Sequence, residues 1–104
     1  MIRAEFLTGG GKLRGFQISG HAGGEAGTDI VCAAVSSAAY LTANTVTEIL
    51  GVEAEISCDE GFLSCVVPET EVATCSAVLE GLRLHLFALA DQYPKNIHAN
   101  NAEV

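Results

Sequence analysis

The sequence has few basic residues: five Lys and Arg stand against 13 Asp and Glu, which gives a formal net charge of −8. So few cations exclude the broad basic surface that nucleic-acid-binding domains use. An acidic surface permits attraction to a basic peptide, but many cytoplasmic proteins carry such a charge without that role. The charge alone therefore identifies no function.

Long apolar runs are also lacking. No uninterrupted stretch reaches the about 18 apolar residues that a membrane helix needs. Residues 1–8 place Arg3 and Glu5 among apolar residues, which is a strand pattern and not a signal peptide. We therefore expect a cytoplasmic protein without a membrane segment. The 104 residues, 49% of them hydrophobic, fit a single domain over 1–104.

The four cysteines lack the spacing of a metal site, since neither Cys-x-x-Cys nor Cys-x-x-His occurs. We therefore expect no zinc and no other metal. Without a signal peptide, a disulfide framework is not expected either. Cys58, Cys65 and Cys75 are predicted to be small buried hydrophobic residues.

Alternation of apolar and polar residues predicts two β-hairpins. The first has strands at 1–8 and 13–20 around a glycine turn, and the second has strands at 52–58 and 62–67 around Asp59-Glu60-Gly61. Ile2, Ala4 and Phe6 are expected to share the buried face of the first strand.

Helical periodicity predicts helices over 30–50 and 71–93, the second capped by Thr70. The core face of the first helix is predicted to consist of Ile30, Ala34, Ala38, Leu41, Thr45 and Ile49. A short strand is predicted over 95–99, followed by frayed residues. The order ββαββα, with a last β, predicts an α+β two-layer sandwich whose helices both pack on one face of a mostly antiparallel, mixed sheet.

In the second helix, one apolar stripe is predicted to face the core. It consists of Cys75, Val78, Leu79, Leu82, Leu86, Leu89 and Tyr93. Leu84, Phe87 and Ala88 form a further apolar patch on another side of this helix. The patch fits either additional core or a surface for self-association.

The candidate catalytic residues lie within residues 20–36. His21 ends a strand, a glycine-rich loop follows, and Asp29 is placed to cap the first helix, which makes Cys32 its third residue. The exposed N–H groups and the positive end of the helix dipole favour a reactive thiolate there. The loop is long enough to bring His21 back to Cys32 as a general base.

The glycine-rich loop does not have the pattern of a phosphate-binding loop. It contains neither Gly-x-Gly-x-x-Gly nor a Walker sequence, it has no lysine, and Glu25 and Asp29 would repel a phosphate. We therefore predict a mobile flap over the substrate peptide. The substrate loop comprises Gly20, Ala22, Gly23, Gly24 and Gly27.

Two polar residues near Cys32 have open roles. Asp29 either caps the helix alone or also orients His21. Ser36 lies one turn after Cys32, where its hydroxyl either joins the site or bonds a carbonyl of its own helix.

The string Gly-His-Ala, the glycine-rich loop and Asp-Ile-Val-Cys-Ala-Ala-Val-Ser, together residues 20–36, resemble the ribosomal-processing cysteine protease family Prp. Two departures are Ala26, where the family has an aromatic residue, and a loop about one residue shorter than the family's. The flanking elements also look similar in order, so the resemblance covers most of the chain.

The resemblance implies Cys32 as nucleophile, His21 as base, and Asp29 and Ser36 as supporting residues. It also implies cleavage of a short N-terminal extension from a bacterial large-subunit ribosomal protein, a homodimer, an apolar groove near Cys32 and no cofactor. Two other classes stay open at this point: a non-catalytic module that binds a ribosomal partner, and a thiol redox regulator that uses Cys32.

Overall fold

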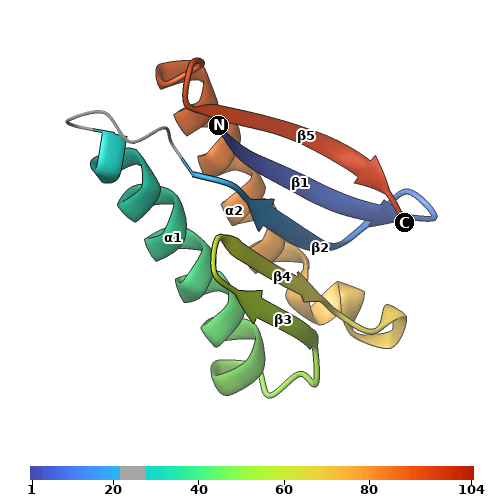
Figure 1. Cartoon of the computed structure of the whole chain (residues 1–104). Helices are drawn as coiled ribbons and strands as arrows, with labels where there is room; N and C mark the ends of the chain where they lie inside the picture. Colours follow the sequence, from blue (N-terminus) through green and yellow to red (C-terminus); the bar gives the residue numbers. More distant parts are fainter. Residues whose placement is uncertain (22–27) are drawn as a thin grey trace.

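The computed structural model describes residues 1–21 and 28–104, and the fold is built on one five-stranded sheet (Figure 1). Its strands are β1 Ile2–Gly9, β2 Lys12–Ser19, β3 Glu55–Asp59, β4 Phe62–Val66 and β5 Ile97–Glu103. They lie in the order β3-β4-β2-β1-β5. All neighbours are antiparallel except β1 and β5, which are parallel, so the predicted mixed sheet is confirmed.

Both hairpins turn on glycines in the left-handed backbone region. Gly10 and Gly11, at φ 60° and 79°, join β1 to β2, and Gly61, at φ 70°, completes the turn between β3 and β4. Residues with a Cβ adopt such φ values at a steric cost, whereas glycine does not. The two predicted turns are therefore confirmed, and each fixes the register of its hairpin.

Two helices cover one face of the sheet, as predicted. Helix α1 spans Thr28–Asn44 and continues through a π-helical turn, Thr45–Ile49. A 3₁₀ turn at Glu69–Glu71 leads into α2, Val72–Gln92. Helix α1 ends before Gly51, whose φ of 67° suits a helix stop, and Pro94 follows the end of α2.

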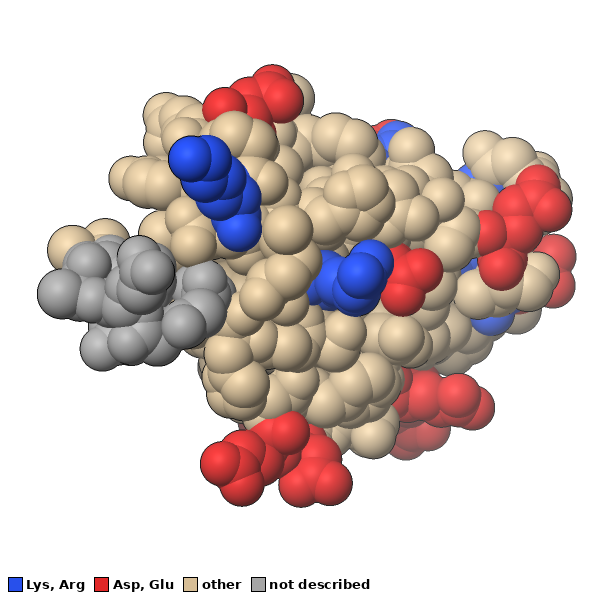
Figure 2. Space-filling view, turned by 45° about the horizontal axis from the view of Figure 1, so that its top comes forward, with Lys and Arg blue, Asp and Glu red and all other residues tan. Residues whose placement is uncertain are grey.

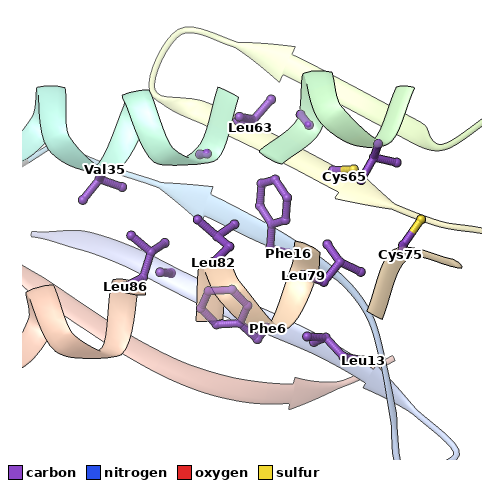
Figure 3. Close-up of a cluster of buried hydrophobic side chains, with 14 of the residues drawn as sticks. Phe6, Leu13, Phe16, Val35, Leu63, Cys65, Cys75, Leu79, Leu82 and Leu86 are labelled. Atoms are coloured by element: carbon purple, nitrogen blue, oxygen red, sulfur yellow. The ribbon is translucent and has the colours of Figure 1, made fainter. Parts of the chain in front are cut away.

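The core fills the space between the helices and the sheet (Figure 3). Phe6 and Phe16 from β1 and β2 are fully buried beneath Leu79 and Leu86 of α2. Ile2 and Ala4 are also buried, which confirms the predicted face of the first strand.

The predicted core face of α1 is wrong. Ile30, Leu41 and Ile49 are 69%, 69% and 78% exposed. The helix instead buries the neighbouring stripe: Val31, Val35, Ala39, Thr42, Ala43 and Val46. Both stripes repeat at helical spacing, and the buried stripe is shifted by one residue along the chain from the predicted one. Periodicity alone therefore does not distinguish them. The buried stripe has the smaller side chains, which allow the helix to lie close to the sheet.

The α2 prediction holds at its centre, since Cys75, Leu79, Leu82 and Leu86 are buried, whereas Tyr93 is 40% exposed. Thr70 does not cap the helix, because it lies within the preceding 3₁₀ turn.

The apolar patch predicted on another side of α2 divides in two. Phe87 packs on Phe6 with ring centroids 6.0 Å apart, whereas Leu84 is 76% exposed. Phe87 therefore belongs to the edge of the core, and Leu84 belongs to the surface.

The edge strands also differ from their predictions. The strand β3 begins at Glu55 instead of residue 52, and all five of its residues are exposed, including Cys58. Cys58 is therefore not a buried hydrophobic residue, because it lies on the outermost strand at this edge of the sheet. At the other edge, β5 extends to Glu103 instead of fraying, because it pairs along the length of β1.

Two helical stretches, Ile30–Ile49 and Glu69–Gln92, are long and apolar enough by length and composition to span a membrane. Both contribute side chains to the core between the helices and the sheet. Core helices of water-soluble domains have the same length and composition, so this feature is weak evidence for a membrane segment.

Candidate active site

A pocket of ≈ 170 Å³ lies between α1 and the strands beside it. It is lined by Ile2, Ile18, Gly20, His21, Cys32, Val35, Ser36, Ala39, Tyr40, Asp59, Gly61, Phe62 and Leu63. The structure therefore brings the predicted nucleophile, the predicted base and Ser36 to one pocket. Most of the other lining residues are apolar, as expected for a groove near Cys32.

His21 lies two residues after the end of β2, and backbone hydrogen bonds hold it there. The Gly20 N–H donates to the Gly61 carbonyl at 3.0 Å, and the Met1 nitrogen donates to the His21 carbonyl at 2.6 Å. Gly20 has a φ of 89°, and a Cβ there would overlap the Met1 carbonyl oxygen. Only glycine fits at this position, which explains why Gly20 precedes the histidine.

The imidazole of His21 lies over the turn between β3 and β4. A Cβ built on Gly61 would come within 3.0 Å of its Nε2 atom. The glycine therefore serves two purposes here: it supplies the left-handed turn and leaves room for the imidazole ring.

Cys32 lies on the opposite wall, on α1. Because the helix begins at Thr28, Cys32 is its fifth residue and not its third, and Asp29 is a helical residue rather than the cap. The half-buried thiol is flanked by Val31 and Val35, which are buried in the core and fix the orientation of the helix. The field of a helix terminus decays within the first turn, so the dipole contributes less at Cys32 than the sequence predicted.

Ser36 lines the pocket one turn after Cys32. Three threonines further along, Thr42, Thr45 and Thr47, return their hydroxyls to the carbonyl four residues earlier, at 2.8, 2.7 and 3.1 Å. Among the described hydrogen bonds, Ser36 makes none of this kind. Its exposed side chain therefore leaves the hydroxyl open to the pocket that it lines.

Ala22, Gly23, Gly24 and Gly27 of the substrate loop, and Ala26, lie outside the described residues, as does the side chain of Asp29.

The remaining cysteines and histidines separate into buried and peripheral groups. Cys65 and Cys75 are buried, and they form no disulfide within the part of the chain that the structure describes. Burial raises the pKa of the Cys65 thiol to about 11 and also raises the pKa of Cys75. His85 and His98 are exposed and do not line the pocket that holds Cys32.

The structure adds a contact that the sequence did not predict. Tyr40, two turns after Cys32, places its hydroxyl 3.1 Å from the sulfur of Cys58 on β3. The sequence places Tyr40 on the same helix face as Cys32 and Ser36, because the three are spaced by four residues. It does not predict that Cys58 lies beside Tyr40, because the position of Cys58 depends on where the second hairpin joins the sheet.

Known proteins resemble this chain over nearly all of its length. The family model described as cysteine protease Prp matches residues 1–98. The structure of SMU.848 from Streptococcus mutans is 29% identical, with 100% of this chain and 96% of that chain covered and a TM-score of 0.86. Comparison with curated proteins gives no match.

Two further structures are of an essential ribosomal processing protease Prp from S. aureus. The one with a covalently linked product peptide is 25% identical, covers 98% of this chain and 100% of that chain, and has a TM-score of 0.86. The one with a substrate peptide, at 24% identity over 98% and 100% and a TM-score of 0.87, supports the fold alone. The family predicted from residues 20–36 is confirmed: this chain belongs to the cysteine protease Prp family.

Proposed function

We propose that this cysteine protease removes a short N-terminal extension from a bacterial large-subunit ribosomal protein, with Cys32 as nucleophile and His21 as base. The observation that carries the proposal is that these two residues, from α1 and from the end of β2, line one pocket. A thiol and an imidazole that converge on one pocket are the parts that nucleophilic peptide hydrolysis requires.

The two reacting residues of the proposed mechanism lie on different walls of the pocket. The Cys32 sulfur attacks the scissile carbonyl carbon while His21 accepts the thiol proton. His21 then gives this proton to the leaving amine nitrogen as the C–N bond breaks, and a thioester remains on Cys32. A water molecule activated by His21 hydrolyses the thioester and restores the thiol.

Two supporting roles complete the proposed site. Backbone N–H groups near Cys32 stabilise the oxyanion of the tetrahedral intermediate. The Ser36 hydroxyl, exposed at the pocket and not bonded to its own helix in the described structure, is available to a polar group of the substrate. Asp29 is proposed to support the start of α1, and Gly20, Ala22, Gly23, Gly24 and Gly27 are proposed as the substrate loop.

The choice of substrate has two supports. One is that a structure 25% identical to this chain is of a ribosomal processing protease. The other is charge: carboxylates outnumber cations by 13 to 5. In the face that Figure 2 shows, most of them lie towards the rim, and basic and acidic side chains also lie next to each other near the centre. An apolar peptide segment attached to a basic ribosomal protein suits such a surface. The proposed location is the cytoplasm, where ribosomes assemble.

We also propose a homodimer that forms through the outer face of α1. The stripe of Ile30, Leu41 and Ile49 is exposed although it has the apolar spacing of a buried face. A groove of ≈ 330 Å³ between α1 and α2, lined by residues that include Leu41, Val78 and Leu82, continues it. Exposed apolar surface of this kind marks interaction sites. Sedimentation of wild type as a dimer, and of Leu41→Glu as a monomer, tests this; a monomeric wild type refutes it.

The proposed function is tested with the organism's own ribosomal precursor protein. Wild type is expected to remove the extension, and Cys32→Ala and His21→Ala are each expected to slow removal by more than about a hundredfold. His98→Ala is the matched control, because His98 is exposed and does not line this pocket, and this variant is expected to cleave. A Cys32→Ala variant that still cleaves, or a wild type that leaves the precursor intact, refutes the proposal.

A further inference from the structure

A tyrosine and a cysteine form a bridge between the helix layer and the edge of the sheet. The Tyr40 hydroxyl lies 3.1 Å from the Cys58 sulfur, and either atom is able to donate. Tyr40 lines the same pocket as Cys32 and Ser36. The three residues recur every four positions, so they lie along one face of α1.

The bridge stands at the opposite end of this helical wall from the nucleophile. Eight residues separate Tyr40 from Cys32, which corresponds to about 12 Å along the helix axis. An extended peptide advances about 3.3 Å per residue. A substrate chain that starts at Cys32 therefore reaches Tyr40 about three or four residues away from the bond that is cut.

Among the described residues of β3, Asp59 alone lines the pocket. Every residue of β3 is exposed, and Ile56, which precedes Cys58 by two positions on the same face, is 44% exposed. Tyr40 is itself 46% exposed. Its ring is therefore held across the gap by the bond to Cys58 rather than by burial.

The pocket is small enough for such a wall to matter. Its ≈ 170 Å³ is well below the about 300–1,000 Å³ of typical small-molecule sites. A space of this size suits one side chain of a peptide, enclosed by apolar residues such as Val35, Ala39 and Leu63.

We propose that the Tyr40–Cys58 pair limits the size of the substrate side chain that this pocket accepts, so that Tyr40 is a specificity-determining residue of the protease. The proposal rests on the proposed use of Cys32 as nucleophile. The ring of Tyr40 forms the wall, and Cys58 holds the ring in place. The bond to Cys58 raises the pKa of the Tyr40 phenol, which favours the uncharged ring at the pocket wall.

The test uses N-acetyl tetrapeptide chloromethyl ketones, which alkylate a nucleophilic cysteine without knowledge of the natural substrate. Each peptide carries Leu, Phe or 2-naphthylalanine at one of the four positions and Ala elsewhere. The rate constant for alkylation of Cys32 is measured by intact mass and peptide mapping, which separates it from alkylation of Cys58.

At one of the four peptide positions, wild type is expected to react at least about tenfold more slowly when the residue is 2-naphthylalanine than when it is Leu. This ratio of rate constants is the scale of discrimination that one pocket wall provides. Tyr40→Ala is expected to reduce this ratio to below about threefold. Tyr40→Phe and Cys58→Ala keep the ring but lose the bond, so intermediate ratios are expected. Cys58→Ser keeps a hydrogen-bonding partner and should retain the wild-type ratio.

Tyr93→Ala is the matched control, because Tyr93 is 40% exposed at the end of α2 and does not line this pocket. Equal ratios in wild type, Tyr40→Ala and Cys58→Ala overturn the proposal, as does a change of the same size in Tyr93→Ala. If Tyr40→Ala does not fold, Tyr40→Phe and Cys58→Ala decide the question. Absence of alkylation at Cys32 with every peptide overturns the proposed function and this inference together, whereas alkylation with unchanged ratios overturns this inference alone.

Discussion

Replacement of Gly61 by Ala is expected to lower both the stability of the fold and the activity of the site, whereas replacement of Gly11 by Ala should lower the stability alone. Gly61 has a φ of 70°, and a left-handed residue with a Cβ costs about 1–2 kcal/mol. For a domain of this size that loss lowers Tm by about 4–8 °C per kcal/mol. Gly11, at φ 79° in the other hairpin, has no atom within 4 Å of the point that a Cβ would occupy, so Gly11→Ala carries the backbone cost alone.

The effect on activity should differ between these two variants. The new Cβ at Gly61 would lie 3.0 Å from His21 Nε2 and 3.4 Å from its Cε1, so the imidazole must shift by a few tenths of an ångström. Such a shift costs little in folding, because the ring is exposed and able to rotate. In catalysis a misplacement of about 1 Å costs about a hundredfold, so about a tenfold loss in kcat/KM is expected.

The assay combines thermal unfolding with cleavage of a peptide that spans the proposed ribosomal extension. Gly61→Ala and Gly11→Ala should lose similar amounts of Tm, whereas only Gly61→Ala should lose about tenfold in kcat/KM. The reasoning is refuted if Gly61→Ala cleaves within twofold of Gly11→Ala, since the position of the imidazole would then not control the rate.

Further predictions concern the sheet and the buried thiols. Gly15→Ala should abolish folding, as judged by circular dichroism, because its Cβ would overlap the Cys65 carbonyl oxygen and lie 2.9 Å from Val66 Cα, and neither backbone atom is able to yield. Iodoacetamide at pH 8 should modify Cys58 in the folded protein but reach Cys65 and Cys75 only after unfolding; equal labelling of all three contradicts the burial. Because the folded state holds the Cys65 proton up to a pKa of about 11, against an ordinary value of 9.0, stability should fall as pH rises from 9 to 11, by at most about 2.7 kcal/mol. Urea unfolding of wild type and Cys65→Ala across this range measures the effect, and equal slopes would exclude Cys65 as its source.

Local patterns in the sequence were sufficient for the order of the elements. The glycines at 10, 11 and 61 each precede a strand and require a left-handed backbone, so the hairpins follow from local chemistry. The face of α1 did not follow, because two apolar stripes compete and only the packing distance to the sheet decides between them. The strand β5 was predicted too short, since His98 and three asparagines near it favour no strand by themselves and adopt one by pairing with β1.

In the site, too, features set by local sequence were predictable and features set by tertiary packing were not. His21 and Cys32 were predictable because they flank one loop, and their proximity needs only that the chain turn back. Tyr40 with Cys58, and Gly61 beneath the imidazole, were not predictable. Their positions depend on β4 pairing with β2, which brings a hairpin some forty residues away in the chain beside His21.

The division of the site between two layers has a consequence for the chemistry. His21 is attached to the sheet and Cys32 to the helix, so the distance between imidazole and thiol is set by how closely α1 packs on the strands. That spacing is determined by small buried side chains such as Val35 and Ala39, which also line the pocket. Because packed interiors tolerate little change in volume, the core fixes the spacing between the proposed nucleophile and the proposed base. The apolar face of α1 that periodicity favoured has larger Ile and Leu side chains. If that face were buried, the helix would lie further from the sheet and the gap for the proposed proton transfer would be wider.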